Sequence, residues 1–210
     1  MRTLFLLLAA VLCFTSCQKE IDDTIGGSNN NNGGGGNNNS SIIGTWDFVG
    51  LNAQTHTTNE FDFMGFNSKA VAVFNYASTN NTGTVSFTDN TMSSNGMAYT
   101  VSGDITTYGY EDGVLTDSVT TPTDMDFSVT NSTVPYVRVN SDSLYFPEGG
   151  FSIETADGSS PSEPTGLQLH FNGDTLKLTQ IIFKDSTSTE NGINYHIQIN
   201  ATGNILLKKQ

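Results

Sequence analysis

The chain has 210 residues, enough for one domain with accessory segments. It carries 8 Lys and Arg against 21 Asp and Glu, which gives a formal net charge of -13. Because nucleic acids and anionic lipid heads attract basic proteins, this balance excludes nucleic acid as a partner and argues against adhesion through a basic patch. The acidity is typical of a soluble domain that faces solvent.

The N-terminus has the features of an export signal. Arg2 precedes an uncharged apolar run over residues 4–14, which is too short to span a bilayer comfortably as a permanent helix. Two small residues then precede Cys17. We therefore expect residues 1–16 to be a signal peptide that is removed. Its loss leaves 7 basic and 21 acidic residues, so the mature charge is 7 minus 21, or -14.

The sequence "FTSC" at residues 14–17 resembles a bacterial lipobox, with Phe14 where Leu is usual. This resemblance implies that Cys17 becomes the mature N-terminus and carries a thioether-linked diacylglycerol and usually an N-acyl chain such as palmitate. Each buried CH2 contributes roughly 0.8 kcal/mol, so two or three chains anchor a protein firmly. The other cysteine, Cys13, follows Leu12, a poor cleavage-site residue. The alternative is an ordinary signal that leaves Cys17 free.

Residues 17–41 are expected to form the lipidated cysteine and a disordered tether. Residues 29–39 are all Asn or Gly, which bury little apolar surface and leave the backbone free. The 24 residues after Cys17 would reach roughly 25–30 Å as a coil. "QKEIDD" at residues 18–23 resembles the Lys-plus-acidic tract of surface-exported Bacteroidota lipoproteins, interrupted here by Ile21. This resemblance implies exposure at the cell surface; the alternative is a solvated charge cluster.

Residues 42–210 alternate apolar and polar residues with a period of two, which predicts half-buried strands. Asn-Gly and Asp-Gly pairs mark turns at 95–96, 112–113, 157–158, 172–173 and 191–192. We expect an all-β domain of about 8–10 antiparallel, up-and-down strands, as a barrel or alternatively an open β-sandwich. The stretch 63–74 could be a short helix or a strand, and 155–166 is the longest obvious loop.

"GTW" at residues 44–46 resembles the G-x-W signature at the start of the first lipocalin strand. A lipocalin-like barrel implies that Gly44 lets the chain pass closely at the barrel base and that Trp46 plugs that end. Lipocalins add a late-strand Arg over the indole, and here the last strand offers Lys208 and Lys209 instead. The resemblance also implies a ligand cavity or its remnant, which these aromatic residues could line if they are not simply core: Phe63, Phe66, Tyr99 and Tyr195.

Four Asp-Ser/Thr-aliphatic triplets resemble the O-glycosylation motif of Bacteroidota envelope proteins. Thr24, within the expected tether, is the best candidate for modification. The alternative is that such a triplet leads from a turn into a strand. A native protein with the mass of the lipidated chain alone would contradict glycosylation.

Residues for catalysis or metal binding are not indicated. The mature domain has no cysteine, hence no disulfide, thiolate metal site or cysteine nucleophile. His56, His170 and His196 lack metal-ligand spacing, and the last two sit at outward strand positions. Because the acidic residues cluster at turns, where Asp is favoured locally, we expect neither an enzyme nor a cofactor. The sequence assigns no ligand-binding residue.

We expect a lipid-anchored, non-enzymatic protein of the outer membrane, exposed at the cell surface. Its β-barrel would bind a small apolar or amphipathic ligand or an envelope protein. The alternative is a β-sandwich lipoprotein that binds glycans or mediates adhesion.

Overall fold

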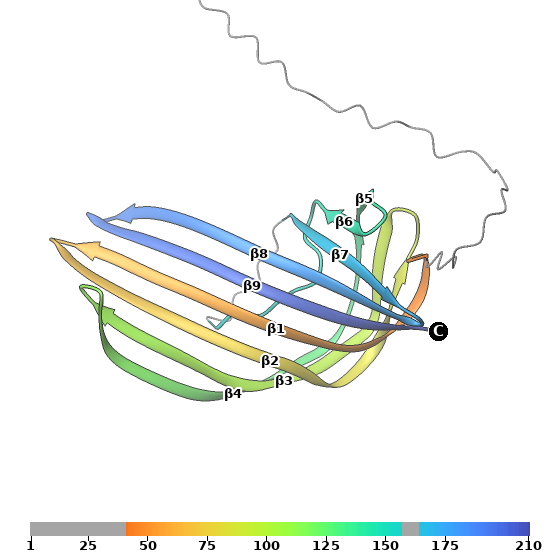
Figure 1. The fold of residues 1–210 in the computed structure, drawn as a ribbon, viewed down its shortest axis with the longest axis horizontal. Helices are drawn as coiled ribbons and strands as arrows, with labels where there is room; N and C mark the ends of the chain where they lie inside the picture. Colours follow the sequence, from red (N-terminus) through yellow and green to blue (C-terminus); the bar gives the residue numbers. More distant parts are fainter. Residues whose placement is uncertain (1–40, 157–163) are drawn as a thin grey trace, which may run out of the picture. The chain divides into compact units, whose positions relative to one another are not determined.

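The computed structural model describes residues 41–156 and 164–210, and these contain nine β-strands and no helix (Figure 1). The strands are β1 (Gly44–Phe63), β2 (Phe66–Phe87), β3 (Thr91–Glu111), β4 (Val114–Pro135), β5 (Val137–Asn140), β6 (Ser143–Phe146), β7 (Thr165–Asn172), β8 (Thr175–Glu190) and β9 (Ile193–Lys209). They form one antiparallel sheet in the order β4-β3-β2-β1-β9-β8-β7-β6-β5. The expected all-β, up-and-down fold is therefore confirmed. The predicted signal, Cys17, Thr24 and the predicted tether up to residue 40 lie outside the described residues.

The two edge strands of the sheet are joined in the chain by one residue. β4 ends at Pro135, which pairs with Thr91, and β5 begins at Val137, which pairs with Tyr145. Nine strands about 4.8 Å apart would separate the edges of a flat sheet by nearly 40 Å, whereas two residues of chain span at most about 7 Å. The sheet must therefore curl until β4 and β5 approach each other at this end. It remains open, because β4 and β5 are edges rather than hydrogen-bonded neighbours.

The core lies inside this curl, at the end where β1 begins. Inward side chains of β1 alternate with exposed ones, and a β-bulge between Phe48 and Gly50 shifts the alternation by one residue. Because residues 42–210 contain no cysteine, burial of apolar surface is the main source of stability for this domain. The largest fully buried side chains are Trp46, Phe74, Phe87, Phe146, Ile42, Leu144, Ile153, Leu167, Leu176, Leu178, Ile205 and Leu207.

The segment after β6, residues 147–156, fills the inside of the curl. Ile153 and Thr155 are fully buried, and the backbone N–H of Glu154 donates a hydrogen bond to the Tyr76 hydroxyl at 2.9 Å. A Cβ on Gly203 of β9 would lie 2.4 Å from Cδ1 of Ile153, so this glycine makes room for the isoleucine. Within the part of the chain that the structure describes, this segment therefore occupies much of the interior.

The far ends of the long strands form hairpins. β1–β2, β3–β4 and β8–β9 each close with a two-residue turn, at residues 64–65, 112–113 and 191–192. β7 pairs with β8 no further than Gln180, and β5 and β6 have four residues each. Six strands therefore extend to this end, too few to surround an interior, and the sheet opens there (Figure 1).

The stretch 63–74, which could have been a short helix or a strand, forms the β1–β2 hairpin and part of β2, so its strand alternative is confirmed. Two other local expectations need correction. The Asn95-Gly96 pair is not a turn; it lies inside β3 at an irregularity in the register with β2 and β4. A Cβ on Gly83 of β2 would lie 2.5 Å from the backbone of Gly96, so the close approach of two backbones accounts for Gly83. Gly96 has a φ of +64°, which accounts for the second glycine. The long loop begins at residue 147 rather than 155.

None of the residues that the structure describes belongs to a helix long and apolar enough to cross a membrane.

Candidate functional site

Trp46 lies at the closed end of the curl. Its indole N–H donates a hydrogen bond to the carbonyl of Ile42 at 2.8 Å, and its ring centroid is 6.2 Å from that of Phe171. The preceding glycine has a different role from the one expected. Nothing lies within 4 Å of a Cβ built on Gly44, but its φ of +130° is a conformation that L side chains rarely adopt. Gly44 is needed for the backbone angle rather than for a close approach.

A lysine occupies the position over this indole. The Nζ of Lys209 lies 5.7 Å from the centroid of the Trp46 ring, within the range of a cation–π interaction. The other late lysine, Lys208, points instead to Asp174, with Nζ 3.7 Å from a carboxylate oxygen. Arg138 is elsewhere and donates to the carbonyls of Asn140 and Ser141. Of the two lysines that the sequence offered, Lys209 is therefore the one that caps the tryptophan.

Among the described residues, the one interior cavity that we consider is small. A cavity of about 120 Å³ lies between β3, β4 and the 147–156 segment, whereas sites for drug-sized ligands occupy roughly 300–1,000 Å³. Tyr99, one of the aromatic residues considered as a cavity liner, stacks on Phe127 at 4.6 Å and also packs on Phe48. The other three aromatic residues considered, Phe63, Phe66 and Tyr195, are in the hairpins.

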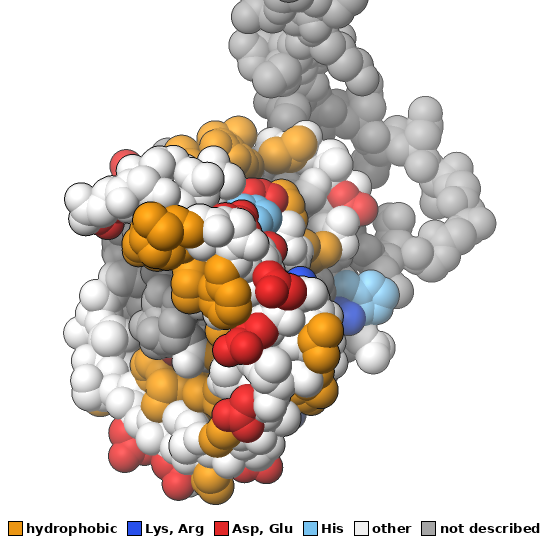
Figure 2. Space-filling model, turned by 90° about the vertical axis from the view of Figure 1, so that its left-hand side faces the viewer, with side chains coloured by type: hydrophobic (Ala, Val, Ile, Leu, Met, Phe, Trp, Pro, Cys, Tyr) orange, Lys and Arg blue, Asp and Glu red, His pale blue; other side chains and the backbone are white. Residues whose placement is uncertain are grey.

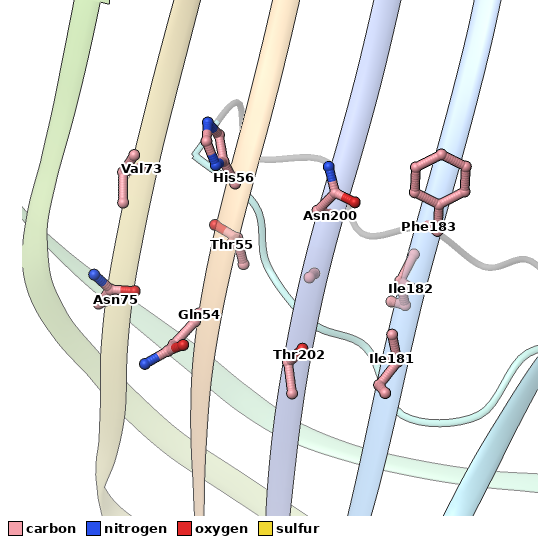
Figure 3. A pocket seen from close by; sticks show the side chains of 11 residues that line it. Gln54, Thr55, His56, Val73, Asn75, Ile181, Ile182, Phe183, Asn200 and Thr202 are labelled. Atoms are coloured by element: carbon pink, nitrogen blue, oxygen red, sulfur yellow. The ribbon is translucent and has the colours of Figure 1, made fainter.

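The outer face of the sheet carries a groove of about 360 Å³ that crosses four strands (Figure 3). Strand register arranges its outward side chains in two rows. One row runs Val73, His56, Asn200 and Phe183, from β2 across β1 and β9 to β8. The second row, one alternation further along each strand, runs Asn75, Gln54, Thr202 and Ile181. Residues far apart in sequence thus form one continuous platform.

Hydrogen bonds hold the rows on either side of this groove. Thr179 donates to Asn204 at 2.9 Å, and Asn204 donates to Asn52 at 3.1 Å. On the other side, the amide of Gln198 donates to Asp185 at 3.3 Å. Within the groove, by contrast, the side chains of Gln54, His56 and Asn75 have no hydrogen-bond partner among the described residues. Their donors and acceptors are therefore available to a ligand.

The groove is neutral and has an aromatic wall. No Asp, Glu, Lys or Arg is among the described residues that line it. Phe183 is 62% exposed, and Ile181 beside it is also exposed. Primary amides donate and accept hydrogen bonds in pairs, and an exposed ring offers a flat apolar face. This combination suits a neutral ligand with hydroxyl groups on its rim and an apolar C–H face, as a sugar ring has.

A histidine and two carboxylates lie close together further toward the hairpins on the same face. His196 is 2.9 Å from an oxygen of Asp185 and 3.8 Å from one of Glu60. Hydrogen bonds from His196 and then Gln198 hold the pKa of the Asp185 carboxyl below its usual value. Among the described residues, no group of three or more His, Cys, Asp or Glu side chains is placed to hold a metal ion. His196 and His170 both point outward, as the sequence predicted.

The sequence pattern did not assign the groove, because its members occupy the polar positions that strand alternation places toward solvent. Two signals were available. Outward positions of β9 carry the amides of Asn194, Gln198, Asn200 and Asn204. In "QIIFKD", the run Ile181, Ile182 and Phe183 places apolar side chains on both faces of β8.

Comparisons with protein families, with curated proteins and with solved structures give no match for this chain.

Proposed function

We propose that the protein is a non-enzymatic, lipid-anchored binding protein of the outer envelope and that its outer groove binds neutral glycans. The main support for this proposal is the two-row platform, in which the unpartnered amides of Gln54 and Asn75 share one groove with exposed Phe183. Of the two binding functions that the sequence suggested, the glycan alternative has this support. The small-ligand alternative has less, because the described interior is filled by Ile153 and its neighbours.

The dimensions of the groove support a carbohydrate ligand. Its volume of about 360 Å³ falls at the lower end of the range for small-ligand sites. Four neighbouring strands about 4.8 Å apart give a platform roughly 14 Å wide, which is long enough to contact more than one sugar ring. A ring stacked on Phe183 would bring its hydroxyl groups toward Asn200 and His56, which follow in the same row.

The proposed location depends on Cys17. A lipidated Cys17 followed by the predicted tether of residues 18–41 would present the domain at the outer membrane, on the surface side if the "QKEIDD" tract acts as the resemblance implies. Metabolic labelling with a palmitate analogue should label the protein, and Cys17→Ser should abolish the label. Protease added to intact cells should remove the domain. A labelled but protease-resistant protein would contradict surface exposure alone.

The glycan proposal is tested with the full-length protein, purified from membranes in detergent, on an array of neutral and acidic glycans. We expect selective binding of neutral glycans, with a loss of about tenfold or more in affinity for Phe183→Ala and for Gln54→Ala. Val129→Ala is the matched control, because Val129 is an exposed apolar residue on β4, away from the groove. Equal binding by Phe183→Ala and the unchanged protein, or binding confined to acidic glycans, would overturn the proposal.

A further inference from the structure

Three hairpin turns lie at the same end of the sheet, and one of them has an unusual residue. The first turn residues are Met64, Asp112 and Asn191, with φ of +51°, +47° and +52°, and each is followed by a glycine with positive φ. Two-residue turns with this backbone favour Asn, Asp or Gly, because other side chains are sterically strained there. Asp112 and Asn191 follow that rule, whereas Met64 does not.

Met64 is also the most exposed of the large apolar side chains that the structure describes, at 90%. A strained backbone position is thus occupied by a hydrophobic residue that packs on almost nothing in the protein. Strained positions of this kind are concentrated at functional sites. Asp112 and Asn191, at the same position of the other two turns, show which residues folding alone favours there. Met64 can therefore be compared with equivalent positions in the same protein.

Further large apolar side chains are exposed on the hairpin of Met64 and on the hairpin next to it. We call the following set the hairpin-tip surface: Phe61, Phe63, Met64, Phe66 and Val114. All five are exposed, and the strand register places the four members other than Met64 on the same face of the adjacent β1–β2 and β3–β4 hairpins. Figure 2, which faces this end of the molecule, shows hydrophobic side chains close to acidic ones. Aromatic residues and methionine are the types enriched in the centres of protein interfaces.

The tips are held in place by hydrogen bonds. The backbone N–H of Asn67 donates to the Asp112 carboxylate at 3.0 Å. The backbone N–H of Asp112 donates in return to the Asn67 carbonyl at 2.9 Å. The side-chain amide of Asn67 donates to Glu60 at 2.7 Å and to Asp62 at 2.8 Å. The two hairpins are therefore joined before any partner arrives, and a preformed surface loses less entropy on binding.

The charge around the hairpin-tip surface is strongly negative. Residues 58–70, 108–118 and 187–196 contain one basic residue, Lys69, and six acidic ones, for a net charge of 1 minus 6, or -5. The acidic residues are Glu60, Asp62, Glu111, Asp112, Asp117 and Glu190. Two of them line a hollow of about 620 Å³ beside the β8–β9 hairpin, together with the hydroxyls of Thr187 and Ser188. Carboxylates and hydroxyls accept hydrogen bonds, so this hollow suits a Lys or Arg side chain.

We propose that the hairpin-tip surface docks a protein segment that carries both apolar and basic side chains. The apolar side chains would cover Met64 and its neighbours, and a basic side chain would enter the hollow beside Asp62. Charge opposes the other two occupants of such a surface. Anionic lipid heads would be repelled by the acidic rim, and two copies of this chain would bring like charges together. The proposal does not depend on glycan binding by the outer groove.

The test uses the full-length protein in detergent and two synthetic probes, an amphipathic helical peptide of Lys and Leu and its counterpart of Glu and Leu. We expect the Lys/Leu peptide to bind more weakly as salt increases, and the Glu/Leu peptide not to bind. Met64→Asn should weaken binding about tenfold or more, because it removes the central apolar contact. The same change should raise the urea concentration at the unfolding midpoint, because Asn suits the turn better than Met.

Two further variants test whether the acidic charge contributes to peptide binding. Asp62→Asn keeps an acceptor for Asn67 but removes one charge, so it should weaken peptide binding several-fold and reduce the salt dependence. Val129→Asn, at an exposed position on β4, should change neither binding nor its salt dependence. Equal binding of both peptides, unchanged binding by Met64→Asn, Met64-dependent binding to phosphatidylglycerol vesicles, or a Met64-dependent dimer in sedimentation would each overturn the proposal.

Discussion

The two ends of the long strands have the same alternation of residues but different surroundings. On the inward face of β1, Trp46 is 1% exposed near the start of the strand, whereas Phe63 at its end is 40% exposed. At the first end, β6, β7 and the 147–156 segment complete the enclosure. At the other end six strands continue without these neighbours. Alternation therefore decides which face a side chain occupies, and the number of strands beside it decides whether it is buried.

Truncating one aromatic residue at each end tests whether the two ends differ in how much burial stabilises them. Trp46→Ala should lower the free energy of unfolding by about 3–5 kcal/mol, because it leaves a cavity and frees the Ile42 carbonyl. Phe63→Ala should cost less than about 1 kcal/mol, since much of its ring already contacts water. Urea unfolding followed by tryptophan fluorescence or circular dichroism measures both.

Circular dichroism is required for Trp46→Ala, which has no other tryptophan. If that variant does not fold, Trp46→Phe keeps a ring and loses only the indole and its hydrogen bond. Equal costs for the two ends would mean that the hairpin end is as well packed as the core, contrary to its exposure.

Alkaline pH should destabilise the fold through the buried tyrosines at the end where β1 begins. Burial of the hydroxyl, and then the charge of Glu154, raises the pKa of Tyr99 to about 12, and burial also raises the pKa of Tyr76. A folded pKa above the unfolded value of about 10 stabilises the fold fully below pH 10 and loses this contribution as pH rises toward 12. For Tyr99 the loss should reach at most about 3 kcal/mol.

The measurement is the urea midpoint at successive pH values from 9 to about 12. Tyr99→Phe removes the ionising hydroxyl and should flatten the decline, whereas Tyr145→Phe, at an exposed position on β6, should not. A decline that is unchanged by Tyr99→Phe would show that another group destabilises the fold at high pH.

Much of the strand content could be predicted, because it is local. Stretches such as residues 193–199 alternate strictly, and Asp112-Gly113 and Asn191-Gly192 mark their hairpins by the residues that positive φ favours. The Met64-Gly65 turn has no such mark, so its hairpin was ambiguous. The path of residues 147–156 through the interior was also beyond prediction, since it depends on contacts such as Ile153 against Gly203, which are distant in the chain.

The candidate site could not be predicted for a related reason. Gln54 meets Asn75 on one side and Thr202 on the other only through the pairing of β1 with β2 and β9. Strand pairing over such separations is set by the whole sheet, and a shift by one residue would turn each of these side chains to the other face. Cys17 and Thr24 were inferred from local motifs alone, and both remain predictions.

Variants at Gly203 and Ile153 should have a smaller effect on stability, and they test how the 147–156 segment packs against β9. Gly203→Ala places a Cβ against buried Ile153 and should cost about 1–3 kcal/mol. Ile153→Val removes the nearest carbon, and should cost about 0.5–1.5 kcal/mol by itself. The double variant should be less destabilised than the sum of the two, and a double-mutant cycle by urea unfolding measures the difference. Strict additivity would mean that the segment moves away when the Cβ is introduced.

The smallest expected effect is at the rim of the filled end, where Lys209 lies over Trp46. Lys209→Met keeps an apolar chain of similar length but removes the charge, and should cost about 0.5–1 kcal/mol, as expected for an exposed cation–π pair. Lys209→Arg should retain stability, because a guanidinium also stacks on an indole face. Lys208→Met is the matched control, since its exposed pair with Asp174 should contribute little. Urea midpoints in low and high salt separate the two lysines. If Lys209→Met and Lys208→Met have equal effects, the cation over the indole contributes nothing specific to the stability of this end.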